Sequence, residues 1–154
     1  MKRKALFLLF YCSTLFANAA NMYVTISGDD THDGTSWESS KSSIQAAIDA
    51  SSVGDTVFIA EGIYNQSIKV KDGVHVFGGY DAFTGNRDYE VYSTIIDGTG
   101  LGKAIVNQGS SFKNPTYFDG LVLQNANHSS NGGDVILKAS GILNICTIND
   151  CTAT

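Results

Sequence analysis

Residues 42–80 constrain the fold more than any other stretch, because one short helical pattern is followed there only by short apolar runs. Ile44, Ala47 and Ile48 show the i, i+3, i+4 spacing of one helix face, and a serine at 42 or 43 can cap the helix start. Three runs of four to six residues follow, TVFIA, SIKV and VHVFGG, each bounded by turn residues. Such runs are typical of β-strands. We therefore expect a helix over residues 41–51 and strands after it.

The pattern of strands and turns continues along the chain. Residues 22–27 form a further strand-like run before the helix, and from Val57 onward the main runs recur at steps of 19, 19, 26 and 25 residues. Residues 81–93 interrupt the series as one surface loop. A loose period made only of strands and turns indicates coils of parallel strands that stack on one another. The residues expected to point into the narrow core are Val57, Ile59, Val76, Ile95, Leu121 and Cys146.

Length and charge limit the classes of protein and partner. The chain has 154 residues, enough for one domain, with 16 glycines and one proline to serve many tight turns. Its formal net charge is −5, and three of its ten basic residues lie at positions 2–4. Without those three the charge is −8, and an acidic surface repels nucleic acid and anionic lipid. We therefore expect no nucleic-acid partner.

The first 19 residues have the pattern of a secretory signal peptide. Three basic residues precede an apolar stretch at 5–16, and Ala17-Asn18-Ala19 is a small-x-small cleavage site. The apolar stretch is too short to span a bilayer. A lipid anchor on Cys12 is the alternative, but the residues before Cys12 are large, whereas lipid attachment sites usually have small ones. We predict cleavage after Ala19 and a mature domain over residues 20–154.

Several segments together resemble the N-terminal part of bacterial secreted right-handed parallel β-helix proteins, the pectin-lyase-like superfamily. The segments that carry the resemblance are YVTISGDDTHDGTSW at 23–37, SIQAAIDASSVGDTVFIAEGIY at 43–64, KDGVHVFGGY at 71–80, RDYEVYSTIIDG at 87–98, FDGLVLQNA at 118–126 and GGDVILKASGILNICTINDCTA at 132–153. The resemblance implies an all-β, right-handed parallel β-helix of about four to five coils. It also implies a short helix that caps the first coil, and a secreted or cell-surface location.

Function is less constrained, because this fold carries polysaccharide lyases, glycoside hydrolases and adhesins. We expect a glycan-binding or adhesin-like interaction module without a catalytic site of its own. The alternative is a fragment of a polysaccharide lyase or glycoside hydrolase. Proteins of this superfamily usually have many more coils, so the chain is expected to be truncated at its C-terminus. Its open last coil, residues 142–154, is then expected to favour self-association.

The candidate chemical groups are isolated in the sequence. Asp97 and Asp119 precede glycines, where turn residues are typical, and Asp150 is a further lone acid. His75 alternates with valines and is expected to face solvent from a strand. Arg87 and Asp88 match a dipeptide that recurs in the superfamily, and we expect a loop-anchoring ion pair or turn contact there. No catalytic or cofactor-binding residue is therefore assigned.

Two polar features have alternative interpretations. The loop 28–34 carries Asp29, Asp30 and Asp33, which suit a polar turn or, alternatively, a calcium ion. Cys146 and Cys151 remain after cleavage, and a buried thiol at Cys146 is preferred over a disulfide. The Asn-x-Ser sequons that begin at residues 65 and 127 are interpreted as chance matches.

Overall fold

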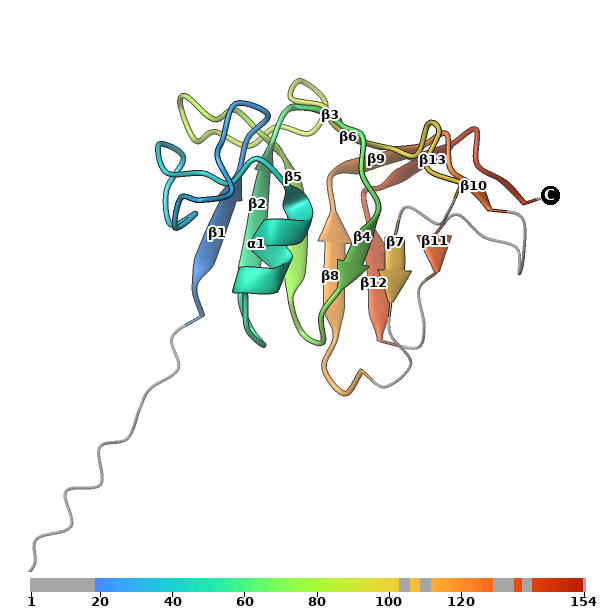
Figure 1. Ribbon diagram of the computed structural model, residues 1–154, viewed down its shortest axis with the longest axis horizontal. Helices are drawn as coiled ribbons and strands as arrows, with labels where there is room; N and C mark the ends of the chain where they lie inside the picture. The colour runs from blue at the N-terminus through green and yellow to red at the C-terminus, as the bar shows by residue number, and fades with distance from the viewer. Residues whose placement is uncertain (1–18, 103–105, 109–111, 129–134, 137–139, 154) are drawn as a thin grey trace, which may run out of the picture.

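The computed structural model describes residues 19–102, 106–108, 112–128, 135–136 and 140–153. Residues 1–18 of the predicted signal peptide lie outside this range. In the described part the protein is mostly β-structure, with one helix, α1 (Ile44–Ala50), and strands that pair in parallel in four sheets (Figure 1). No helix of the described part is long and apolar enough to cross a membrane. The all-β class with parallel pairing is therefore confirmed.

Three sheets carry most of the strands. The first sheet has the order β1-β2-β5-β8-β12, formed by Asn21–Val24, Thr56–Ala60, His75–Tyr80, Thr116–Asp119 and Gly141–Asn144. The second has the order β13-β9-β6-β3, formed by Thr147–Asn149, Leu121–Gln124, Thr94–Asp97 and Gly62–Tyr64. The third has the order β11-β7-β4, formed by Val135–Ile136, Val106–Gln108 and Ile68–Val70. A fourth pairs β10 (Asn127–His128) with β14 (Thr152–Ala153).

The chain visits these sheets in a recurring order. After β2 in the first sheet come β3 in the second and β4 in the third, and β5, β6 and β7 then repeat this succession one position further along each sheet. The predicted series of main strands, however, mixes two sheets. Val57 pairs with Val76 and Val76 pairs with Phe118 in the first sheet, whereas Ile95 and Leu121 belong to β6 and β9 of the second sheet. The step from β5 to β8 is longer than predicted, because the loop 81–93 and the strands β6 and β7 lie between them in the chain.

The core between the sheets largely matches the prediction. Val57, Ile59 and Val76 are fully buried and Leu121 is 1% exposed. Ile95 is a correction: its side chain lies on the outer face of β6, whereas Ile96 is fully buried. Neighbouring side chains in a strand point to opposite faces, so only one of the two isoleucines can reach the core.

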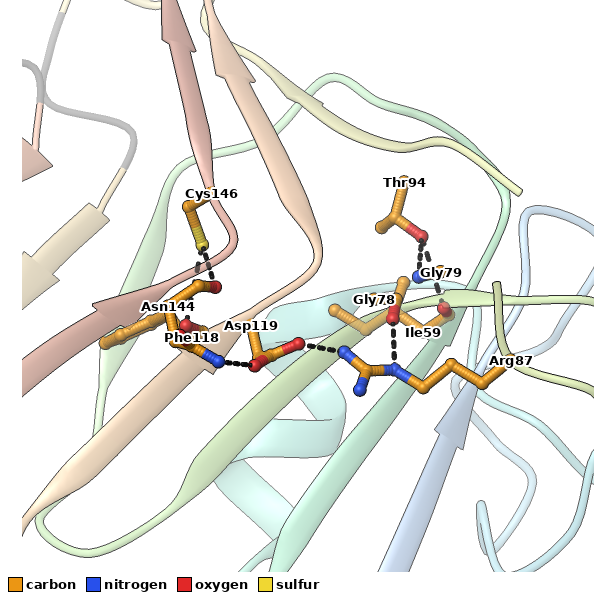
Figure 2. A network of polar contacts seen from close by, with 9 residues as sticks. All are labelled: Ile59, Gly78, Gly79, Arg87, Thr94, Phe118, Asp119, Asn144 and Cys146. Atoms are coloured by element: carbon orange, nitrogen blue, oxygen red, sulfur yellow. Dashed lines mark hydrogen bonds and ion pairs between the residues drawn. The ribbon is translucent and has the colours of Figure 1, made fainter. Parts of the chain in front are cut away.

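Thr94 fills the other inward position of β6 with a polar side chain whose hydrogen bonds are satisfied. Its Oγ1 accepts a hydrogen bond from the amide of Gly79 at 2.9 Å. The same hydroxyl donates to the carbonyl of Ile59 or Ala60, at 3.2 and 3.1 Å. A buried hydroxyl with both partners present avoids the penalty of an unsatisfied polar group. Thr94 thereby ties the second sheet to the ends of β2 and β5 (Figure 2).

The predicted helix is present but shorter than the expected range 41–51: α1 spans Ile44–Ala50 and packs against β4, β1 and β2. Ser43 caps its start, accepting a hydrogen bond from the Ala46 amide at 3.0 Å. The predicted apolar face, Ile44, Ala47 and Ile48, is fully buried in the core. A helix of seven residues is marginal alone, so this docking is what stabilises it.

Apolar side chains on the last strands of the first two sheets are partly exposed. Ile142 and Leu143 of β12 are 41% and 37% exposed, and Ile148 of β13 is 48% exposed. The expected self-association through residues 142–154 remains a prediction.

Candidate functional site

Aromatic side chains form a continuous row on the outer face of the first sheet. Inward residues of β1, β2, β5 and β8 are buried, whereas the alternating outward positions carry rings. The members of this aromatic row are Tyr23, Trp37, Phe58, Tyr80, Phe77, His75 and Tyr117. Tyr117 is 38% exposed and the other six are half-buried. The row therefore presents ring surface to solvent across four strands.

Ring contacts link the row from one end to the other. At the β1 end, the Trp37 ring centroid lies 4.7 Å from that of Tyr23 and 5.7 Å from that of Tyr80. Phe58 lies 5.0 Å from Tyr80 and 6.3 Å from Phe77. These separations and tilted arrangements are those favoured by the quadrupoles of aromatic rings. Mutual packing thus holds the rings in place before any ligand arrives.

His75 and Tyr117 continue the row on β5 and β8. The His75 ring stacks on Phe77 at 6.2 Å and meets the Tyr117 ring at 5.1 Å. His75 Nδ1 accepts a hydrogen bond from the Tyr117 amide at 3.4 Å. Burial lowers the pKa of His75 below its ordinary value of 6.5, so the imidazole is neutral at pH 7. The expected outward position on a strand is confirmed, but the ring packs in the row rather than standing alone in solvent.

An ion pair anchors the loop 81–93 next to this row (Figure 2). The Arg87 guanidinium pairs with the carboxylate of Asp119 and donates from Nε to the Gly78 carbonyl at 3.0 Å. It also lies 5.5 Å from the ring centroids of Phe77 and Tyr80. Both alternatives expected at Arg87 and Asp88 are therefore present, an ion pair at Arg87 and a turn contact at Asp88, which accepts from the Glu90 amide at 3.0 Å.

Asp119 lies on the outer face at the end of β8, so the turn interpretation is only partly right. Its carboxylate also accepts a hydrogen bond from the Asn144 side chain on the next strand of the sheet (Figure 2). The turn is made by the following residue, Gly120, which has a φ of 66°. A Cβ there would lie 2.9 Å from both the Arg87 guanidinium and the Gly78 carbonyl oxygen, so a side chain would displace the anchor.

A cleft of about 360 Å³ adjoins the ion pair. One wall begins two residues after Arg87, with Tyr89 and Glu90, and another begins directly after Asp119. The full lining is Tyr89, Glu90, Ser93, Thr94, Gly120, Leu121, Val122, Ile145, Cys146 and Thr147. Gly79 permits the loop to lie this close, since a Cβ there would come within 2.8 Å of the Tyr89 backbone.

Asp97 acts as a turn residue, as predicted. Its Oδ1 accepts hydrogen bonds from the Thr99 amide at 2.7 Å and the Thr99 hydroxyl at 2.5 Å. Its Oδ2 accepts from the side-chain amides of Gln124 and Asn125 at 3.0 and 3.2 Å. These bonds lower the pKa of Asp97 from 3.8 to about 2. Asp150 is exposed with a φ of 48°.

The carboxylates of the loop 28–34 accept hydrogen bonds from the protein itself. Asp29 and Asp33 each bind the amide and hydroxyl of the threonine two residues later, as a polar turn requires. Asp30 accepts from the amides of Ser42 and Ser43 before α1. In the described part of the chain, no three His, Cys, Asp or Glu side chains are grouped as metal ligands would be. The hydrogen bonds expected of a polar turn are thus present at Asp29 and Asp33, and calcium binding at this loop stays an untested alternative.

The cysteines of the described part, Cys146 and Cys151, are both thiols. Cys146 lies half-buried against the core, and its S–H can donate to the Asn144 carbonyl at 3.3 Å or to the Phe118 carbonyl at 3.5 Å (Figure 2). Burial raises the pKa of the Cys146 thiol. The predicted free thiol at Cys146 is thus present and packs against the core, although Cys146 is less deeply buried than expected.

The sequon asparagine at 65 has a structural role, since its side chain donates to the carbonyls of Asp97 and Thr99, both at 3.1 Å. The side chain of the asparagine at 127 lies outside the described residues.

Comparison of the chain with known protein families, curated proteins and solved structures found no match.

Sequence reasoning missed the aromatic row itself. The rings of Phe58 and Phe77 lie inside the apolar runs TVFIA and VHVFGG, which indicate strands but not a binding surface. Strict alternation in these runs places Val57, Ile59 and Val76 on one face and the rings on the other. That alternation was the available signal, but Trp37 comes from a loop and no local pattern could place it beside Tyr23.

Proposed function

We propose that this protein is an exported right-handed parallel β-helix protein that binds a glycan on the outer face of its first sheet. The fold proposal is supported by the recurring order in which the chain visits three parallel sheets and by α1 beside the first strands. Export is proposed from the signal pattern of residues 1–19. In this proposal the protein is an interaction module and not an enzyme.

The aromatic row is the observation that carries glycan binding. The faces of a sugar ring carry C–H groups, so they pack on aromatic faces, while the sugar hydroxyls remain available for hydrogen bonds. Rings from β1, β2, β5 and β8 follow one another across the sheet, where neighbouring strands lie about 4.8 Å apart. A row of this kind fits a linear polymer that lies across the strands better than it fits a compact ligand.

The single tryptophan of the chain makes this proposal directly testable, because Trp37 lies in the row. Titration of the purified protein with oligosaccharides should change Trp37 fluorescence. Tyr117→Ala, which removes the ring that closes the β8 end, should weaken binding by about twofold to tenfold. Phe83→Ala is the matched control, because Phe83 is 95% exposed and makes no ring contact with the row among the described residues.

The proposal fails if no oligosaccharide alters the fluorescence, or if Tyr117→Ala and Phe83→Ala behave alike. The same samples test the enzymatic alternative, a fragment of a polysaccharide lyase or glycoside hydrolase. New reducing ends or unsaturated products during incubation with polysaccharides would replace the binding module with an enzyme.

A further inference from the structure

We propose that the cleft beside the Arg87–Asp119 pair binds an amine-bearing sugar, so that the glycan on the aromatic row contains hexosamine units with free amino groups. This inference rests on the proposed function and names the class of glycan. It goes beyond the row, because the cleft lies where the loop 81–93 meets β9 and β13.

The cleft combines apolar surface with hydroxyl groups, as a sugar-binding site requires. Val122 and Cys146 line the cleft and are half-buried, so they offer it apolar surface. Ser93 and Thr147 are exposed and carry hydroxyls at its margin. Apolar walls with a few placed polar groups are the usual composition of small-molecule sites. A volume of about 360 Å³ accommodates one sugar unit and its linkage to the next.

Charge decides which sugar fits. Glu90 is the one charged residue among those that line the cleft. Its amide donates to Asp88 at 3.0 Å, but its carboxylate has no hydrogen bond or ion pair within the described residues. An ammonium group of the ligand would give this carboxylate a charge-assisted hydrogen bond. An acidic sugar would instead meet a like charge.

The cations of the described part are unsuited to anionic sugars. Lys41 and Lys71 each direct Nζ to two backbone carbonyls, and Arg87 is engaged by Asp119. Lys69 belongs to the third sheet, and Lys113 lies before β8, outside the cleft lining. Uronate and sulfate groups are usually recognised by free Arg or Lys. In the described part of the chain, the charges around the cleft therefore favour a cationic glycan over a polyuronate.

The experiment compares two probes that differ in charge. A glucosamine tetrasaccharide and its fully N-acetylated counterpart are titrated calorimetrically into the full protein. The wild type should bind the amine form about tenfold more tightly, which corresponds to one charge-assisted hydrogen bond. Glu90→Gln should abolish this preference, whereas Glu61→Gln should keep it, because Glu61 is an exposed carboxylate outside the cleft.

The outcomes separate this inference from the proposed function. If the two probes bind equally, or if Glu90→Gln keeps the preference, the amine site is wrong even though Tyr117→Ala still weakens both probes. If neither probe nor any other oligosaccharide binds, both proposals are wrong. Glu90 is exposed, so Glu90→Gln should not disturb the fold. An unchanged melting temperature of this variant would show that it folds.

Discussion

Arg87 and Asp119 are separated by 32 residues, yet one contact between them organises the candidate site. The Asp119 side chain is 12% exposed and that of Arg87 is 31% exposed, so the pair is partly desolvated. Such pairs add little net stability, because desolvation offsets much of the attraction between the charges. The pair's effect is geometric: it fixes the loop 81–93 against the row and so forms a wall of the cleft.

Asp97 provides a residue-scale prediction about pH. Asp97→Asn would place an NH₂ group where Oδ2 accepts from Gln124 and Asn125, so donors would face donors. We expect the free energy of unfolding at pH 7 to fall by about 1 kcal/mol. The pKa is about 2 in the folded protein and 3.8 ordinarily, so the carboxylate stabilises the fold above about pH 4. This contribution should disappear as the pH falls from about 4 toward 2.

Urea unfolding of the wild type and Asp97→Asn at several pH values measures this difference. Asp150→Asn is the control, because the Asp150 side chain is exposed. Equal stabilities of the wild type and Asp97→Asn at pH 7 would contradict the prediction.

At the scale of elements, α1 closes an edge that would otherwise be open. Strand β4 ends the third sheet, and one side of it faces the helix. Gln45 of α1 accepts a hydrogen bond from the Lys69 amide at 2.7 Å and donates to the Lys69 carbonyl at 3.2 Å. One side-chain amide thus takes the place of a neighbouring strand. Unpaired edges invite association between chains, so this contact protects the protein as well as stabilising it.

Gln45→Ala should remove both hydrogen bonds to β4. We expect the free energy of unfolding to fall by about 1–2 kcal/mol and the protein to associate more at high concentration. Lys69→Ala is the matched control, because it keeps the backbone groups to which Gln45 binds. Thermal unfolding and sedimentation velocity provide the two measurements. An effect of Lys69→Ala as large as that of Gln45→Ala would assign the loss to the β4 side chain instead.

For the whole molecule, the sequence predicts local features well and pairings between distant segments poorly. Short apolar runs and glycine turns predicted the strands, and the apolar face of α1 identified its buried side. The choice of Ile95 over Ile96 as the inward residue is wrong, because either choice satisfies the alternation. The contact between Arg87 and Asp119 has no local signal, since it depends on how the segments between them fold. Alternation places the rings of the strands on one face, but the ion pair and the position of Trp37 depend on contacts between distant segments.

Substitutions on the neighbouring strands β6 and β9 test whether the core unfolds as one unit. Leu121→Ala on β9 should lower the free energy of unfolding by about 2–5 kcal/mol, because Leu121 is buried in the shared core. Ile95→Ala on β6, whose side chain lies on the outer face, should change it by less than about 1 kcal/mol. If coils stabilise one another, Leu121→Ala should shift a single unfolding transition. Urea unfolding followed by far-ultraviolet circular dichroism measures both effects. A second transition in Leu121→Ala, or a larger loss in Ile95→Ala, would mean that the core is divided or that the facing of these strands is reversed.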